Sequence, residues 1–76
     1  MASLLPGSRD GVLRGVTPFD LHGERYYHIL YALDGVSDGV AEARVAHEAI
    51  YADPRPGDGV SIRFMMGVVT KVEKRP

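Results

Sequence analysis

The segment Val60–Glu73 alternates apolar and polar side chains along its length. Its even positions are apolar except for Thr70, and Met65 and Val69 are the large apolar residues at its odd positions. A period of two is typical of a β-strand that buries one face in a core. This pattern constrains the fold more than any other part of the chain, and it predicts that the even-numbered side chains point inward.

Two arrangements are considered for this alternation: one continuous strand, or a hairpin with a two-residue turn at Met66-Gly67. Two-residue turns favour Asn-Gly, Asp-Gly or a leading glycine, and a turn here would also expose the apolar Met66. Glycine within a strand often marks a sharp bend. We therefore predict a single continuous strand over Val60–Glu73 that bends at Gly67.

The first apolar segment, Gly11–Leu21, carries apolar residues at both parities and contains Gly15 and Pro18. Glycine in a strand often marks a bulge, and proline confines a strand to the edge of a sheet. We predict an irregular edge strand here, followed by a turn at residues 22–24.

The second segment, Arg25–Leu33, is rich in tyrosine and aliphatic residues at both parities. Aromatic residues favour strands, and apolar residues on both faces indicate a central position in a sheet. Tyr27 and Tyr31 share one parity, which leaves Tyr26 and His28 on the other face. Asp34-Gly35 predicts the turn that ends this strand.

The third segment, residues 40–51, fits two structures. As a strand it separates the charged residues Glu42, Arg44 and Glu48 from an apolar face, whereas its alanine content favours a single helix with Asp38 as N-cap. The division of charge slightly favours the strand, and the helix stays open as the alternative. The loop that follows, residues 53–59, contains two prolines, and Pro56-Gly57 predicts a type II turn.

The stretch Pro56-Gly57-Asp58-Gly59-Val60-Ser61-Ile62, followed by Gly67-Val68-Val69, resembles a pattern of small five-stranded barrels. Barrels of the oligonucleotide/oligosaccharide-binding (OB) type and of the SH3-like type have a "PGD-x-V-x-V … G-x-V" stretch of this kind. The resemblance implies a mainly β fold, a small five-stranded barrel-like domain, and it names no binding residue.

The chain is short, at 76 residues, and it contains no cysteine. One domain is expected at this length, with residues 1–9 as a flexible N-terminal arm and residues 10–76 as the domain. Disulfides are excluded. No apolar run approaches the roughly 18 residues that span a bilayer, and no signal peptide is recognisable at the start. We therefore expect a cytoplasmic protein that does not contact membranes.

The charges are balanced, with nine Lys and Arg against ten Asp and Glu. Duplex-binding domains usually show a basic excess, which this chain lacks. His22, His28 and His47 do not have the spacing of a metal site, and no nucleophile or nucleotide motif is present. We therefore expect no catalytic residue, no metal and no cofactor, and predict that the protein is not an enzyme.

A binding module is the function that remains, acting on a protein partner or on a second copy through a sheet face or edge. Met65 and Val69 are the outward apolar residues of the last strand and suit strand addition. The alternative is a single-stranded nucleic-acid binder that uses aromatic and basic side chains on one sheet face. A small enzyme or accessory subunit is a second alternative. The candidate partner or nucleic-acid contacts are Arg25, Tyr26, His28, Arg63, Met65, Val69 and Lys71.

Overall fold

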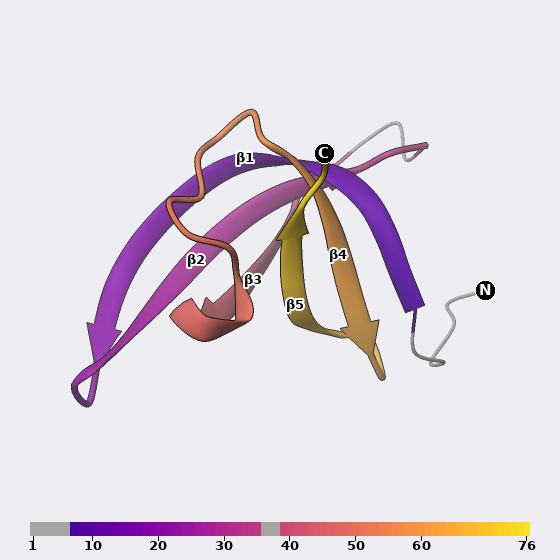
Figure 1. Cartoon of the computed structure of the whole chain (residues 1–76). Helices are drawn as coiled ribbons and strands as arrows, with labels where there is room; N and C mark the ends of the chain where they lie inside the picture. The colour runs from indigo at the N-terminus through magenta and orange to yellow at the C-terminus, as the bar shows by residue number, and fades with distance from the viewer. Residues whose placement is uncertain (1–6, 36–38) are drawn as a thin grey trace.

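The structure is a computed structural model, which describes residues 7–35 and 39–76. Its elements are β1 (Gly7–Leu21), β2 (Glu24–Leu33), β3 (Ala41–Ala46), the short 3-10 helix η1 (His47–Ala49), β4 (Gly59–Met65) and β5 (Val68–Lys74). The strands form one five-stranded antiparallel sheet in the order β3-β2-β1-β4-β5 (Figure 1). The prediction of a mainly β domain with five strands is confirmed.

Strand β1 is the longest element and lies at the centre of the sheet, so the prediction of an edge strand was wrong. Its first part, Gly7–Val12, pairs with β4, while the part from Gly11 to Leu21 pairs with β2. Beyond Val12 the strand therefore has only β2 as a paired neighbour strand, and Pro18 lies in this part. Proline is tolerated there because it has no N–H to donate.

The expected irregularity in β1 is confirmed. The pairing register with β2 shifts between Leu13 and Gly15, so Arg14 is the extra residue of a β-bulge. Bulges bend a strand and increase its twist, and β1 is drawn as an arch over the rest of the molecule (Figure 1). The strand begins at Gly7, so residues 7–9 of the expected arm belong to the sheet. Residues 1–6 of the arm lie outside the described residues.

Strand β2 is central, as predicted, because it pairs with both β1 and β3. Ile29 and Tyr31 are buried, and Tyr27 packs against the core, so the odd-numbered side chains of this strand point inward. A two-residue turn at His22-Gly23 connects β1 to β2, as the pairing of Leu21 with Glu24 shows. Both turn residues have positive φ angles, 52° and 81°, which defines a type I′ turn.

The third segment begins as a strand, which confirms the favoured alternative for Ala41–Ala46. The chain then makes a single 3-10 turn at His47–Ala49, and no α-helix forms in the described residues. The proposed N-cap, Asp38, lies outside the described residues. The alternation of charged and apolar side chains outweighed the helix propensity of alanine, because Val45 is buried against the core.

The loop after η1 contains the predicted type II turn. The amide of Asp58 donates to the carbonyl of Arg55 at 3.2 Å, and Gly57 has a φ of 95°. The loop also bonds to β1: the Leu13 amide donates to the Asp58 carbonyl at 2.9 Å, and the Gly57 amide to the Leu13 carbonyl at 2.7 Å. This loop therefore pairs with β1 next to the position where β4 begins.

The prediction of one continuous strand over Val60–Glu73 was wrong. This segment forms a hairpin, in which Met65 at the end of β4 pairs with Val68 at the start of β5. Met66 and Gly67 make the two-residue turn with φ angles of 55° and 79°, again type I′. Further along, Arg63 pairs with Lys71 and Phe64 with Val69, so Thr70 has no partner and forms a bulge.

The core contains Leu13, Ile29, Tyr31, Val45, Ile50, Val60, Ile62 and Val72. The sheet is not closed into a barrel. Its edge strands β3 and β5 approach each other, and a single parallel bridge connects Ile50, just after η1, to Val72 of β5. No helix in the part of the chain that the structure describes is long and apolar enough to cross a membrane.

Candidate functional site

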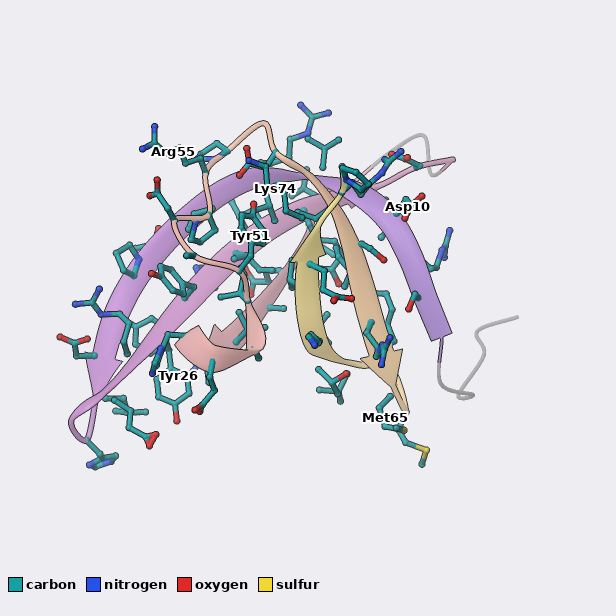
Figure 2. All side chains as sticks on the ribbon, viewed as in Figure 1. Asp10, Tyr26, Tyr51, Arg55, Met65 and Lys74 are labelled. Carbon is teal, nitrogen blue, oxygen red and sulfur yellow. The ribbon has the colours of Figure 1, made fainter. Side chains whose placement is uncertain are left out.

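The turn between β4 and β5 exposes three large apolar side chains. Met65 is 48% exposed, Met66 65% and Val68 62%, and Met65 lies at the lower right of Figure 2, where the hairpin ends. We call Met65, Met66 and Val68 the hairpin tip. Contiguous exposed apolar residues are typical of interaction sites, and methionine is common where a surface must adapt to a partner.

The backbone at this turn is unusual for the residue it carries. Both central positions of a type I′ turn need positive φ, which glycine, asparagine and aspartate adopt most readily. Met66 adopts it with a φ of 55°. Methionine has no polar side-chain group that could bond to the nearby backbone, so this conformation is unfavourable for Met66. Its side chain is directed to solvent.

Two basic residues stand behind the hairpin tip. Arg63 of β4 pairs with Lys71 of β5, and alternation places both on the face of the sheet that also carries Met65 and Val68. Lys71 Nζ lies 3.8 Å from Glu73 Oε2, and both side chains are about half exposed, so this ion pair is weak. The tip is thus apolar at its end and basic behind it.

A shallow groove begins beside the hairpin tip. Its volume is about 280 Å³, and Gly7, Ser8, Arg63, Phe64 and Met65 line it. Phe64 packs against the core, with its ring tilted against that of Tyr31 at a centroid distance of 6.5 Å. The groove connects the hairpin tip to the beginning of β1.

A second exposed surface lies on β1 and β2. Phe19 and Tyr26 are paired across the two strands, and their rings stack with centroids 5.6 Å apart at an interplanar angle of 19°. On the same face His28 pairs with Arg44 of β3, and its Nε2 lies 3.4 Å from Glu42 Oε2. This histidine and acid are on the open sheet face and line neither of the grooves described here.

Arg25 is on the other face of β2, which it shares with Tyr27. Its Nε donates to Asp20 Oδ1 at 2.6 Å, and this hydrogen bond raises the pKa of the Arg25 guanidinium. The sequence-based grouping of Arg25 with Tyr26 and His28 therefore joins residues from opposite faces.

The candidate residues from the sequence divide into two groups. Those on β2 lie toward the β1–β2 hairpin, those on β4 and β5 lie toward the other hairpin, and β1 separates the two strand pairs. The prediction that Val69 points outward was also wrong: Val69 packs against the core, whereas Val68 is exposed. The residues that sequence reasoning missed are Phe19, Arg44, Met66 and Val68.

The basic end of the chain is engaged with acidic side chains. Arg75 Nη1 lies 3.3 Å from Asp34 Oδ2, and its Nε lies 3.8 Å from Asp10 Oδ2. The Arg75 amide also donates to the Gly59 carbonyl at 3.0 Å. These contacts fasten the end of the chain to β1, to β4 and to the turn after β2.

A hydrogen bond within the chain fixes the loop after η1. The Tyr51 hydroxyl donates to Asp58 Oδ2 at 2.6 Å, and the Arg55 amide donates to the same oxygen at 3.1 Å. The bond from Tyr51 lowers the pKa of Asp58. Burial, followed by the bond to Asp58, raises the pKa of Tyr51. Figure 2 shows Tyr51 directed inward beneath the loop that carries Arg55.

A second groove, of about 390 Å³, lies where the sheet is open, between residues 48–51 and residues 71–74 of β5. Within residues 7–35 and 39–76, no three His, Cys, Asp or Glu side chains gather closely enough to hold a metal ion.

Comparisons of the chain with protein-family models, with curated proteins and with solved structures found no match.

Proposed function

We propose that this protein is a non-enzymatic binding module that engages a protein surface through the hairpin tip. The single observation that carries the proposal is Met66. This residue is 65% exposed and has a φ of 55°, so two unfavourable features coincide at one position.

Neither feature serves the fold. A non-glycine residue in left-handed backbone costs about 1–3 kcal/mol, and such strain gathers at functional sites. Asparagine at position 66 would suit the turn better. An exposed methionine contributes nothing to the core, but it supplies a flexible apolar contact for a partner. The neighbours Met65 and Val68, at 48% and 62% exposure, extend the same contact.

Photo-cross-linking tests the proposal. The chain has three methionines, Met1, Met65 and Met66, so replacing methionine with its diazirine analogue places two reactive groups at the hairpin tip. We expect irradiation to produce one discrete protein adduct, in which residue 65 or 66 is joined to a single defined peptide of the partner protein. The matched control is the variant M65L/M66L, which keeps an apolar tip but retains a reactive group only at position 1.

Adducts that form equally in the control, or only at position 1, would contradict the proposal. Loss of the adduct when unlabelled protein competes for the partner supports it, because it shows a saturable site rather than random collision.

We infer an OB-type arrangement that is open between β3 and β5. The strand order β3-β2-β1-β4-β5 and the parallel bridge from Ile50 to Val72 support it, because closing that gap would join the two edge strands. The length of β1, at 15 residues, and its bulge at Arg14 also support it.

Single-stranded nucleic-acid binding is the second candidate function. The stacked rings of Phe19 and Tyr26 favour it, with His28 and Arg44 on the same face, because bases stack on aromatic side chains while basic groups contact phosphates. Titration with labelled oligonucleotides at low and moderate salt tests it. Micromolar affinity that falls steeply with salt and is lost in Y26A would favour this candidate over the first; no binding at low salt would exclude it.

A further inference from the structure

The two exposed hairpins are located at opposite ends of β1. Gly7, at the start of this strand, pairs with Phe64 beside the β4–β5 turn, and Leu21, at its end, pairs with Glu24 beyond the β1–β2 turn. Because β1 is arched, both hairpins project from the same side of the molecule (Figure 1). A rotation of 180° about an axis perpendicular to the plane of the arch would therefore place the β4–β5 hairpin of each copy against the β1–β2 hairpin of the other.

Both hairpins end in exposed apolar side chains. Leu21 is 49% exposed next to the β1–β2 turn, and the stacked pair Phe19 and Tyr26 lies directly behind it. The hairpin tip supplies two methionine thioethers. Sulfur–aromatic contacts are favourable, so the hairpin tip and the β1–β2 hairpin are chemically suited to each other.

On the face that the two hairpins share, the residues nearest the two ends carry charges of opposite sign. Arg63 and Lys71 stand behind the hairpin tip. Glu24 is exposed, faces Leu21 across the β1–β2 hairpin, and shares the face of Phe19 and Tyr26 by alternation. A contact between two hairpin tips would bring Arg63 and Lys71 close to their own copies and would be repulsive. A contact between unlike hairpins brings base to acid.

From this complementarity we propose that the partner of the hairpin tip is a second copy of the chain. Two copies associate about a two-fold axis, and the β4–β5 hairpin of each packs on the β1–β2 hairpin of the other. The contact is made twice and leaves no free end, as in most closed homodimers. The proposal rests on the proposed function, since it uses the same tip, and it adds the identity of the partner.

Sedimentation velocity of the full chain over a concentration series provides the first test. We expect a monomer–dimer equilibrium with no larger species. M66D should raise the dimer dissociation constant at least about tenfold, as truncating a central contact does. M66N suits the turn and should weaken the dimer without unfolding the protein. V40D is the matched control, because Val40 is 54% exposed but is on neither hairpin; its dissociation constant should equal that of the wild type.

A charge-reversal cycle provides the second test. R63E and E24R should each weaken the dimer, and R63E/E24R should recover affinity by about tenfold relative to the weaker single variant, because both sides of the contact are reversed together. Recovery would identify which hairpins meet, since a contact between two like tips gains nothing from E24R.

The outcomes separate the two proposals. A chain that stays monomeric at millimolar concentration, or a dimer unaffected by M66D and R63E, would overturn the proposed dimer. In either case a saturable cross-link from the hairpin tip to a different protein would leave the proposed function standing. Species that keep growing with concentration would overturn the closed two-fold arrangement.

Discussion

Gly11 is the residue of β1 where a side chain is least compatible with the sheet. This glycine pairs with Leu33 of β2 and with Val60 of β4, so it has a strand on each side. A Cβ atom at this position would lie 2.5 Å from the carbonyl oxygen of Ala32 and 3.3 Å from Leu33 Cα. These atoms belong to the backbone of β2, which cannot move without disturbing its hydrogen bonds.

We therefore expect G11A to be strongly destabilising. Overpacking a well-packed site costs about 1–3 kcal/mol, and the backbone obstruction places G11A at the upper end, about 3 kcal/mol. Domains have total stabilities of about 0.05–0.15 kcal/mol per residue, so a chain of 76 residues has about 4–11 kcal/mol. With a urea dependence of about 1 kcal/mol per M, the midpoint of urea unfolding should fall by about 3 M.

Two other glycines of β1 provide matched controls. A Cβ at Gly7 meets nothing within 4 Å, so G7A should be neutral or stabilising by up to about 1 kcal/mol. At Gly15 the nearest atom is Leu30 Cδ1 at 3.1 Å, which belongs to a flexible side chain, so G15A should fall between the other two. Urea unfolding followed by circular dichroism measures all three. A midpoint for G11A equal to that of G7A would refute the argument from backbone contact.

Three further predictions concern the core, the loop and the turn. Ile62 is fully buried, so I62A should destabilise the fold by about 2–5 kcal/mol and I62V by about 0.5–1.5 kcal/mol; equal midpoints of urea unfolding for the two variants would contradict the assigned burial. The pKa of Asp58 is lowered chiefly by the hydrogen bond from Tyr51. The stability that this hydrogen bond contributes is therefore fully present above the usual carboxyl pKa of about 4 and is lost as the pH falls through the lowered pKa of Asp58. Y51F should therefore lose less stability than the wild type between pH 6 and pH 3, and equal losses would contradict this. Met66 has a φ of 55°, so M66N should raise the stability of the monomer by about 0.5–1 kcal/mol, measured by thermal unfolding at a concentration where the protein is monomeric; a lower stability would show that the turn does not favour asparagine.

Strand β2 was predictable as a central strand because its tyrosines and aliphatic residues favour a strand. Apolar residues at both parities indicated a central position, and β2 lies between β1 and β3, which pair with its two edges. The same reasoning failed for β1. Gly15 indicated a bulge and Pro18 indicated an edge, and the part of β1 that contains Pro18 does lack a second neighbouring strand. The first part of the strand carries β4, and nothing local in residues 7–12 indicates that partner, since strand pairing over this separation depends on the whole chain.

The alternation over Val60–Glu73 was misleading because the turn and a bulge each change which positions point inward, and the two changes cancel. A two-residue turn places Met65 opposite Val68, so inward positions change from even to odd across it. The bulge at Thr70 then changes them back, and Ile62 faces Val72 with both side chains buried. Alternation alone therefore matches a continuous strand at both ends of the segment. The difference lies in its middle, where Val69 points inward and Val68 outward.

The candidate site was predictable only in part for the same reason. Met65, Arg63 and Lys71 were placed on one face correctly, because they lie outside the interval between the turn and the bulge. Met66 and Val68 were missed because alternation assigned them to the core. A signal existed in the sequence: Gly67 follows Met66, and glycine at the second turn position is what a type I′ hairpin requires. The preference for Asn at the first position outweighed it.

The arch of β1 links the core to the proposed binding surfaces. Around Leu13 this strand changes partners: β4 ends its pairing at Val12, and the loop at Gly57 and Asp58 takes its place. Gly11 permits the close approach of β1 to β2 there, and the bulge at Arg14 bends the strand just beyond. The bend turns both ends of β1, and the hairpin attached to each, toward one side of the molecule (Figure 1). Without this bend the two hairpins would point in opposite directions, and a rotation of 180° could not bring the β4–β5 hairpin of each copy onto the β1–β2 hairpin of the other. The geometry that encloses the core is thus the geometry that the proposed dimer needs.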